Sequence, residues 1–559
     1  MMNNSLWRRR VDLDFYLHRT FQKRSFRPLQ REVCTAAVEG HDVFLQASTS
    51  FGKSLCFQLP AVAITGVTVV VCPLLSLMTD QVRALQQLNI PVATINSTTP
   101  MDRRQAIMQD LLSGHPRIRL LYVTPELCQT DIFRRNLQTI HSQRELVRIA
   151  IDEAHCISEW GHDFRPAYKQ LSWFREFLTT VPISAFTATA TPQVREDIIK
   201  ILGLDPSRTK IFSTPSARPN IHYEVRFLQD YAPDPQEPEE FQLQDLLSWL
   251  HSIQGRREAR LGADAASLLP PISGIVYIST RRAAELLAQM LSRHDPRIRA
   301  VAYHAGLTAV DRTRVQNEWK APRTQQHQQP NINPQTNPNP ISFYIIVATT
   351  AFGMGIDNPN VRFVIHWSPS KTFEGFVQES GRAGRDGRAA MSVVYYSRQE
   401  RDRILSLLRR DIENVHSRTG GRNRGLDNRD KMATLQNLYA RKQSFEKLVQ
   451  YCEATTRCRH ELIGEFFGDI ELVNIGSQVP VKSEVLVKSE PGDKTGILMP
   501  VSSSCDYACD FCKDPKGLAE RKEKMAREEE LAFLAAGPEW LETMFPLERL
   551  SPELVRRVG

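Results

Sequence analysis

The sequence Ala47-Ser-Thr-Ser-Phe-Gly-Lys53-Ser54 follows a short apolar run, Val43 to Leu45, and leads into the helix-prone stretch SLCFQLPAVAI. A strand, a loop and a helix in this order predict a phosphate-binding loop, because the amides of the loop and of the helix start point at phosphate oxygens. Lys53 would reach the β- and γ-phosphates of a nucleotide, and Ser54 would ligate Mg²⁺. This stretch therefore indicates an α/β domain that binds a nucleoside triphosphate.

Two residues of this loop depart from the strict phosphate-loop pattern. Ala47 stands where the first glycine usually does, and Phe51 is expected to crowd the turn. Taken alone, the loop leaves open a serine-rich turn in front of a buried helix.

A pair of acidic residues supplies the second half of a hydrolytic site. Asp152 and Glu153 follow the predicted strand Leu146 to Ile151, and open α/β sheets bind ligands at the carboxyl ends of their strands. Asp152 could hold Mg²⁺, while Glu153 could orient and deprotonate an attacking water. Adjacent acids after a strand are common at protein surfaces, but with the loop at Lys53 they predict nucleoside triphosphate hydrolysis.

Short Val/Ile-rich runs alternate with amphipathic stretches along the chain, which is the pattern of a parallel sheet covered by helices. The alternation restarts after a polar, proline-rich stretch at 231–240, so we predict two α/β domains in tandem. The predicted strands are Val43 to Leu45, Val67 to Val71, Leu120 to Val123, Leu146 to Ile151 and Ile183 to Phe186, then Gly274 to Ile278, Ile298 to Tyr303, Phe343 to Val347, Phe363 to His366 and Ser392 to Tyr396.

The composition suits an intracellular protein of several domains, with 559 residues, ten cysteines, 71 Lys and Arg against 63 Asp and Glu, and 41% apolar residues. At about 150 residues per domain the length predicts three to four units. No apolar run approaches the roughly 20 residues of a membrane-spanning helix. The N-terminal basic cluster is followed by charges rather than by an apolar signal segment. We therefore expect neither a membrane protein nor an exported, disulfide-bonded one. The formal charge of +8 permits an acidic partner such as nucleic acid without requiring it.

Two segments have the composition of insertions. Residues 321–340 are dominated by Gln, Asn and Pro and cannot build a core, so we expect a disordered loop. Residues 473–504 contain two Val-Lys-Ser-Glu repeats, at Lys482 and Lys488. These repeats resemble a lysine-modification consensus, but they also suit a plain solvated linker.

Three motifs stand in one order along the chain: Phe26-Arg-Pro-Leu-Gln30, the Gly-Lys-Ser motif at Lys53, and Asp-Glu-Ala-His from Asp152 to His155. In this order they resemble the RecQ family of superfamily-two DNA helicases. The resemblance implies that Gln30 recognises the adenine base with help from Arg27, although Phe21-Gln22 replaces the family's usual aromatic-Gly pair.

The resemblance runs from about residue 21 to residue 512 and implies an α/β fold of two tandem RecA-like domains with parallel sheets, followed by a small helical zinc-binding domain. The implied boundaries are 1–215 for the ATP-binding lobe 1, 216–415 for lobe 2, 416–515 for a helical hairpin and zinc module, and 516–559 for a charged helical tail. The implied catalytic residues are Lys53, Asp152, Glu153, His155, Gln378, Arg382 and Arg385, and the implied nucleotide contacts are Arg27, Gln30, Thr49, Ser50, Gly52, Lys53, Ser54, Gly355 and Asp357.

The segment from Cys156 to Arg165, directly after the acidic motif, matches an aromatic-rich loop that is specific to this family. Trp160 and Phe164 offer stacking faces for unpaired bases, and Arg165 offers a cation. Such a loop could signal to the ATP site that DNA is bound. From composition alone, an aromatic cluster packed in a domain interface is the alternative.

Further matches to the family complete the expected DNA contacts. Thr187 and Thr189 resemble its coupling motif, whose hydroxyls bond to the acidic motif, and Arg281 and His304 fall in segments that grip the DNA backbone. The expected DNA-binding or coupling residues are Trp160, His162, Phe164, Arg165, Thr187, Thr189, Arg281 and His304.

Gln378, Arg382 and Arg385 are spaced i, i+4 and i+7. In a helix this spacing lines them along one face, so two guanidinium groups could point at an anion on the neighbouring domain. By resemblance, Arg385 is the arginine finger on the γ-phosphate and Arg382 is its companion. A solvated basic helix face is the alternative.

The cysteines divide into two groups. Cys34, Cys56, Cys72, Cys128 and Cys156 stand singly and are typical of buried thiols. Cys458, Cys505, Cys509 and Cys512 have spacings compatible with tetrahedral Zn²⁺, as the family resemblance also implies. A redox Cys-x-x-Cys is the alternative, and Cys452 is expected to be buried against the same helical hairpin.

The stretch after Cys512 is too short for the winged-helix domain that follows zinc in many RecQ proteins, so we expect the strand-separating wedge to be absent, shortened or supplied in trans. The resemblance implies a nuclear 3′ to 5′ DNA helicase of recombination, repair and replication that uses ATP, Mg²⁺ and Zn²⁺. It would act on single-stranded and forked or junction DNA with other repair proteins. The rivals are a DEAH-type RNA helicase and a DNA-binding or strand-annealing scaffold that lacks turnover.

Overall fold

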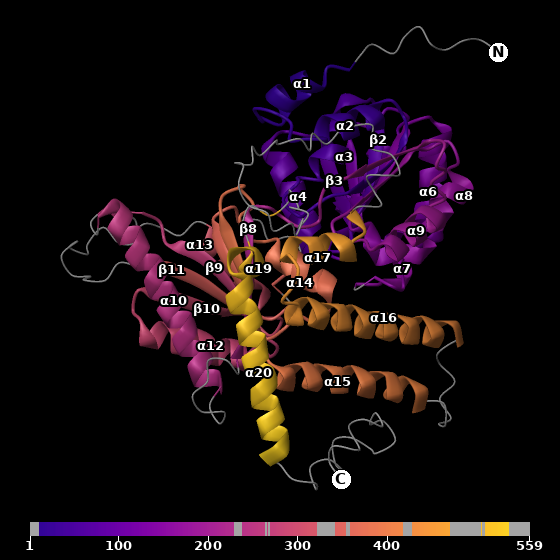
Figure 1. Ribbon diagram of the computed structural model, residues 1–559. Helices are drawn as coiled ribbons and strands as arrows, with labels where there is room; N and C mark the ends of the chain where they lie inside the picture. The colour runs from indigo at the N-terminus through magenta and orange to yellow at the C-terminus, as the bar shows by residue number, and fades with distance from the viewer. Residues whose placement is uncertain are drawn as a thin grey trace, which may run out of the picture.

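The computed structural model describes residues 11–161, 163–228, 238–262, 265–266, 269–320, 341–350, 352–353, 358–417, 428–469, 505 and 509–535. The expected insertions at 321–340 and 473–504, the motifs at Lys482 and Lys488, and the end of the tail at 536–559 lie outside these residues, as do His162, Gly355 and Asp357. Figure 1 shows two α/β lobes and a set of helices beside the second.

The first lobe is built on a seven-stranded parallel sheet with the order β3-β4-β2-β5-β6-β1-β7. Side chains of its strands enter one of two apolar clusters, one on each face of the sheet, which explains the continuous Val and Ile runs of the central strands. The strands are β1 Asp42–Gln46, β2 Val67–Val71, β3 Val92–Ile95, β4 Leu120–Val123, β5 Leu146–Ile151, β6 Ile183–Thr187 and β7 Thr209–Ser213; the main helices are α2 Gln30–Val38, α3 Leu55–Ala63, α4 Leu75–Gln87, α5 Met101–Leu111, α6 Asp131–Ser142 and α9 Pro192–Ile201.

The second lobe repeats this plan with a six-stranded parallel sheet in the order β10-β11-β9-β12-β13-β8. Its strands are β8 Ile221–Phe227, β9 Ile272–Tyr277, β10 Ile298–Tyr303, β11 Phe343–Ala348, β12 Val361–His366 and β13 Ala390–Tyr396, and its helices include α10 Pro238–Leu261, α12 Arg281–His294, α13 Ala309–Lys320 and α14 Phe373–Ser380. The prediction of two parallel α/β domains in tandem is confirmed.

The ten predicted strands are all present, and the structure adds β3, β7 and β8. All three added strands lie at sheet edges. They are less completely buried than the central strands, as in Val92–Ile95, where half-buried and buried residues alternate. An edge strand needs no continuous apolar run, which is why the sequence pattern missed them.

The helical module follows β13 and packs on lobe 2. Its helices are α15 Arg398–Ser417, α16 Asn428–Glu453, α17 Arg459–Phe466, α19 Asp510–Lys513 and α20 Pro515–Ala535. Helices α15 and α16 lie side by side as a hairpin (Figure 1). Phe445, Leu448 and Tyr451 of α16 belong to the same buried cluster as Tyr223 of β8 and Phe376 of α14. The module therefore shares its core with the second lobe.

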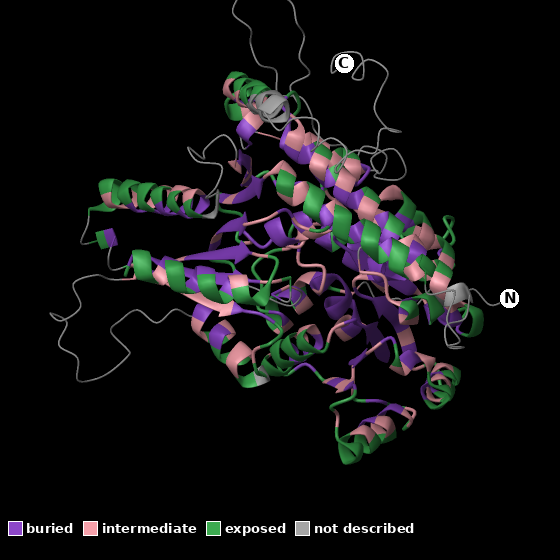
Figure 2. Ribbon diagram, turned by 90° about the horizontal axis from the view of Figure 1, so that it is seen from below, coloured by how far each residue is buried: buried purple, intermediate pink, exposed green. Residues whose placement is uncertain are grey.

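The helices are amphipathic and enclose the sheets. Figure 2 shows buried residues concentrated on the strands and exposed residues on the outer faces of the helices. Within the described part of the chain, no helix combines the length and the apolar character needed to cross a membrane.

Candidate functional site

The phosphate loop joins the end of β1 to the start of α3. The Lys53 ammonium donates to the carbonyls of Ala47 and Ser48 at 3.0 and 3.5 Å, so it lies inside the curve of its own loop. Gly52 has a φ of +83°, and a Cβ there would come within 2.9 Å of the Gln30 amide nitrogen, so the turn requires glycine. Phe51, expected to crowd the turn, packs instead into the apolar core of lobe 1.

Gln30 and Arg27, the two residues expected to contact adenine, hydrogen-bond to the backbone of this loop. The Gln30 amide donates to the carbonyls of Phe51 and Gly52 at 2.7 and 3.3 Å, and its oxygen accepts from the Arg27 backbone N–H at 2.9 Å. The Arg27 guanidinium donates to the carbonyl of Ser50. Both side chains therefore hold the backbone of the phosphate loop in place.

The acidic pair stands at the carboxyl end of β5, beside the phosphate loop. Glu153 adopts left-handed dihedrals, φ +50° and ψ +47°, which turn the chain from the strand into the short helix Ala154–Ile157. Asp152 accepts from the Gln81 amide at 3.4 Å through its carboxylate and from the Tyr168 hydroxyl at 3.0 Å through its carbonyl. The Gln81 contact holds the Asp152 carboxylate at the edge where the strands end, with Glu153 next to it in the chain.

His155 links the acids to the expected coupling motif. Its Nδ1 lies 3.4 Å from a Glu153 carboxylate oxygen and 3.1 Å from the Thr187 hydroxyl at the end of β6. That hydroxyl accepts from the Thr189 N–H at 3.2 Å. A movement of the segment that carries Thr189 would therefore reach Glu153 through Thr187 and His155.

Burial sets the protonation of this group. It raises the pKa of Asp152 to about 7, helped by the neighbouring Glu153 carboxylate and opposed by the Lys53 cation, and it raises the pKa of Glu153 as well. Burial also lowers the pKa of Lys53, and it lowers that of His155 to about 3, so the imidazole is neutral near pH 7. A crowded carboxylate pair of this kind suits a divalent cation, and Asp152 and Ser54 are the residues that would hold Mg²⁺.

The turn after α14 in lobe 2 faces these groups. One prediction is wrong here: Gln378 lies on α14, but the helix ends at Ser380, and Arg382 and Arg385 lie in the turn that follows rather than on one helical face. Even so, both cations affect groups of lobe 1. Burial is the main cause of the lowered pKa of Lys53, and the Arg385 cation lowers it further. The Arg382 cation opposes the rise in the pKa of Glu153. Both guanidinium groups therefore act on the lobe-1 acids and lysine.

A direct hydrogen bond crosses between the lobes next to this turn. The Thr49 hydroxyl of the phosphate loop donates to the Gly381 carbonyl at 3.0 Å. A small cavity between the lobes is lined by Ser48, Thr49, Thr189 and Gln378, among others. Phosphate-loop and coupling residues of lobe 1 thus lie beside Gln378 of lobe 2 in this cavity.

Sequence reasoning missed the residues that shape the arginine turn. Arg218, in the link between β7 and β8, is buried and donates to the carbonyls of Gly381 and Ala383 at 3.0 and 2.8 Å and to that of Gly384. The Asn220 amide donates to the carbonyl of Gly384 at 2.9 Å. These bonds hold the backbone in a turn and explain why the helix stops. The one signal in the sequence is that Arg218 is the single charged residue of the link at 214–220.

The aromatic-rich loop lies between lobe 1 and α16. The Asn437 amide donates to the carbonyls of Glu159 and Gly161 at 3.1 and 3.0 Å. With its amide oriented to satisfy both neighbours, Gln436 accepts from the Trp160 indole N–H at 3.0 Å and donates to the Glu159 carboxylate at 2.8 Å. Trp160 keeps 36% of its surface exposed. This uncharged pair on a helix gave no sequence signal.

The other residues expected to contact DNA lie in two places, one in the aromatic-rich loop and one in lobe 2. Phe164 is half-buried, and the Arg165 guanidinium turns inward to the Pro73 carbonyl at 2.7 Å. His304 is buried in lobe 2, with its Nε2 3.0 Å from a Glu285 carboxylate oxygen. Arg281, exposed at the start of α12, lies next to His304 across Gly306.

The four clustered cysteines come together although they are far apart in sequence. One sulfur from each of Cys458, Cys505, Cys509 and Cys512 lies within 4.8 Å of all the others. The Cys509 sulfur is 3.9 Å from that of Cys458 and 3.6 Å from that of Cys505. Tetrahedral zinc with Zn–S bonds of about 2.3 Å separates its sulfurs by roughly 3.8 Å, so the cluster fits this ion.

The remaining cysteines are buried free thiols. Cys34, Cys56, Cys72, Cys128 and Cys156 are buried in lobe 1, and Cys452 is buried in the core shared by α16 and lobe 2. These positions agree with the interpretation of the single cysteines as core residues.

A buried ion pair ties the cysteine cluster to lobe 2. Arg459, next to Cys458, donates to both carboxylate oxygens of Asp510, next to Cys509, at 2.8 and 3.0 Å. Asp510 also accepts from the Val225 N–H of β8 at 3.0 Å, and His460 lies 3.1 Å from the Arg218 carbonyl. The cluster is therefore bonded to the link that shapes the arginine turn.

Two parallel-sheet lobes with a phosphate loop, an acidic pair and facing arginines define a two-lobed, helicase-type NTPase fold. Comparison with known families agrees: residues 27–198 match the DEAD/DEAH box helicase family, and residues 268–387 match the helicase conserved C-terminal domain. The chain is 36% identical to ATP-dependent DNA helicase Q5 of Mus musculus over 93% of its length and 35% identical to ATP-dependent DNA helicase Q1 of Rattus norvegicus over 81%. It belongs to the RecQ family.

The chain spans only part of the length of these relatives. The chain spans 45% of the length of the mouse protein and 62% of that of the rat protein. Among solved structures, the helicase MrfA bound to DNA matches with a TM-score of 0.50 at 14% identity, over 69% of this chain and 51% of that one. This structural match supports the fold.

Proposed function

We propose that this chain is an ATP-driven motor that moves 3′ to 5′ along single-stranded DNA and separates duplex strands ahead of it. The observation that carries the proposal is the 3.0 Å hydrogen bond from the Thr49 hydroxyl of the phosphate loop to the Gly381 carbonyl, which brings the turn of Arg382 and Arg385 next to the loop of Lys53. A phosphate loop alone would bind a nucleotide, but two arginines from the opposite lobe make hydrolysis depend on how the lobes are arranged.

In the proposed reaction the phosphate loop and Lys53 hold the phosphates of ATP, and Gln30 reads the base. Glu153 accepts the proton of the attacking water, while Arg382 and Arg385 neutralise the charge that develops on the transferred phosphoryl group. Mg²⁺ held by Ser54 and Asp152 would supply further charge neutralisation. Hydrolysis transfers the γ-phosphoryl group to water, and release of the resulting phosphate removes the anion that attracts both arginines, so the lobes separate and close again on the next ATP.

Coupling to DNA is proposed to run through the aromatic loop. Trp160 is exposed enough to stack on a base, and the same loop follows directly on Glu153 and His155. Strand contacts at Arg281 and His304 in lobe 2 would let the two lobes grip the strand in turn. Because such grips act mainly on phosphates, binding should weaken steeply as salt is raised.

The proposed setting is DNA recombination, repair and replication in the nucleus, on single-stranded, forked or junction DNA and with other repair proteins. The names of the relatives as ATP-dependent DNA helicases support DNA as the substrate. The proposal assigns Zn²⁺ to Cys458, Cys505, Cys509 and Cys512, where it would hold the helical module in shape.

Unwinding of tailed duplexes tests the proposed polarity. With ATP, a duplex with a 3′ single-stranded tail should be separated, while the same duplex with a 5′ tail should stay paired. Separation of the 5′-tailed duplex alone would reverse the proposed direction. If neither duplex is separated but DNA still stimulates ATP turnover, the protein would be a translocase that lacks a strand-separating wedge. Absence of both unwinding and turnover would favour the scaffold alternative.

A further inference from the structure

Three polar side chains of lobe 1 form a hydrogen-bond network next to the acidic pair. Tyr122 of β4 is fully buried, Gln58 of α3 is buried and Gln81 of α4 is half-buried. The Tyr122 hydroxyl donates to the Gln81 side-chain oxygen at 2.8 Å and accepts from the Gln58 amide at 3.0 Å. The Gln58 amide also donates to the Gln81 oxygen at 3.3 Å. The network therefore joins α3, β4 and α4.

These bonds fix the orientation of the Gln81 amide. Its oxygen receives two donors, from Tyr122 and Gln58, and an amide nitrogen in the same place could accept neither. The amide nitrogen is therefore turned to the other side, where it lies 3.4 Å from a carboxylate oxygen of Asp152. In the opposite orientation the amide oxygen would face that carboxylate, and two acceptors would meet.

The other end of the network reaches the phosphate loop. Gln58 is one turn into α3, and its backbone N–H donates to the carbonyl of Ser54 at 3.0 Å. Ser54 is the N-cap residue of this helix. Ser54 and Asp152 are the two residues proposed to hold Mg²⁺, so one network connects the elements that carry both of them.

The Asp152 carboxylate retains the capacity to bind a cation. One of its oxygens accepts from the Gln81 amide, and the other accepts from the Glu153 backbone N–H at 3.0 Å. An ionised carboxylate offers about four acceptor positions, so each oxygen has one left. The two bonds hold the carboxylate in place without using up its acceptor positions.

A purely structural explanation covers only part of this arrangement. A buried tyrosine hydroxyl needs a hydrogen-bond partner, and Gln58 alone would provide one. The bond from Gln81 to Asp152 goes beyond that need, because it joins the network to a carboxylate at the edge of the sheet where ligands bind. Metal-binding side chains are commonly oriented by hydrogen bonds of this kind.

We propose that Tyr122, Gln81 and Gln58 are positioning residues for the divalent cation of the ATP site, because they hold the Asp152 carboxylate in register with Ser54. Mg²⁺ accepts little deviation from octahedral geometry, so a small displacement of one ligand costs affinity. The inference rests on the proposed Mg²⁺ site and names the residues that shape it.

The test measures how much Mg²⁺ tightens the binding of nucleotide. The full chain is titrated with a fluorescent, non-hydrolysable ATP analogue, once with excess Mg²⁺ and once with EDTA, and the ratio of the two Kd values is the magnesium-dependent gain. Tyr122→Phe removes only the hydroxyl, and Gln81→Leu removes the amide at similar size. For each we expect the gain to fall about tenfold while the affinity in EDTA stays unchanged.

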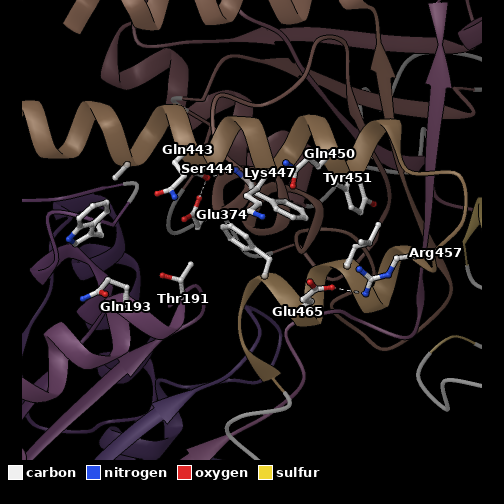
Figure 3. Close-up of a pocket in the computed structure, with 15 residues that line it drawn as sticks. Thr191, Gln193, Glu374, Gln443, Ser444, Lys447, Gln450, Tyr451, Arg457 and Glu465 are labelled. Carbon is white, nitrogen blue, oxygen red and sulfur yellow. Dashed lines mark hydrogen bonds and ion pairs between the residues drawn. The ribbon is translucent and has the colours of Figure 1, made fainter. Parts of the chain in front are cut away.

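A buried hydrogen bond in another part of the molecule provides the matched control. Figure 3 shows Ser444 of α16 beside Glu374 of α14, and the Ser444 hydroxyl donates to the Glu374 carboxylate in the wall of a separate cavity. Ser444→Ala removes a buried hydroxyl, as Tyr122→Phe does, and should keep the full magnesium-dependent gain. Thermal melting checks that each variant is folded.

The outcomes separate the inference from the proposed function. A full gain in both network variants would overturn the inference. An equal loss of affinity with and without Mg²⁺ would also overturn it, because the network would then only support the fold. A wild type that shows no magnesium-dependent gain would contradict the proposed Mg²⁺ site itself, and a wild type that does not bind the analogue would contradict the proposed function.

Discussion

At the scale of single residues, the active cleft depends on side chains that never reach the nucleotide. Arg218 donates to the carbonyls of Gly381, Ala383 and Gly384, around the turn that carries Arg382 and Arg385, and it is itself buried. Its guanidinium hydrogen-bonds to backbone carbonyls, so its role is to position the turn. Arg388, by contrast, is on the same turn with its side chain 85% exposed.

We expect Arg218→Ala to lower the maximal rate of ATP hydrolysis about 100-fold, because displacing a catalytic group by about 1 Å costs that much. The KM for ATP should change little, since Lys53 and Gln30 stay in place. Steady-state kinetics measure both constants, and Arg388→Ala serves as the matched control. A KM increase with an unchanged maximal rate would mean that Arg218 supports binding and not the turn.

At the scale of elements, the aromatic loop and α16 behave as one unit. Asn437 and Gln436 together bind the loop backbone, the Glu159 carboxylate and the Trp160 indole. The loop is therefore held by a helix of another module.

Replacing both residues, Gln436→Ala with Asn437→Ala, should cut the stimulation of ATP turnover by single-stranded DNA at least about tenfold, a cost of the order of two lost hydrogen-bonded contacts. Turnover without DNA should be retained, because the acids and the phosphate loop are untouched. The measurement is ATP hydrolysis over a DNA titration, with Lys442→Ala as the control on the same helix. Equal loss with and without DNA would point to a general structural defect.

The sequence predicted the elements well and their contacts poorly. Central strands such as Val67–Val71 were found because both faces are buried, while edge strands such as Val92–Ile95 lack that signal. The phosphate loop and acidic pair are local motifs, so their positions followed from the strands before them. The end of α14 at Ser380 did not, because it depends on Arg218, which is distant in sequence. Long-range hydrogen bonds leave no periodic trace in a sequence.

At the scale of the whole molecule, the cysteine cluster connects the helical module to the motor lobes. Arg459 and Asp510 bridge two of its cysteines, and Asp510 bonds to β8. Loss of the cluster should therefore loosen lobe 2 as well as the module.

We expect the purified protein to contain about one zinc per chain, and less than about half an equivalent would count against the four-thiolate site. Cys509→Ser should lose the metal and melt roughly 4–8 °C lower, equivalent to about 2 kcal/mol. Metal analysis and calorimetry measure the two effects, and Cys452→Ser is the control because that thiol is buried outside the cluster. If the melting temperature is unchanged after zinc loss, the cluster does not contribute to the stability of lobe 2.

The central claim is that the cleft between the lobes hydrolyses ATP in response to single-stranded DNA. The most direct measurement is steady-state ATP turnover with and without single-stranded DNA, for the wild type beside Lys53→Ala and Glu153→Gln. The wild type should be stimulated strongly by DNA, and both variants should lose at least about 100-fold of that rate. A wild type whose turnover with DNA is no higher than that of the two variants would contradict the motor and leave a DNA-binding scaffold.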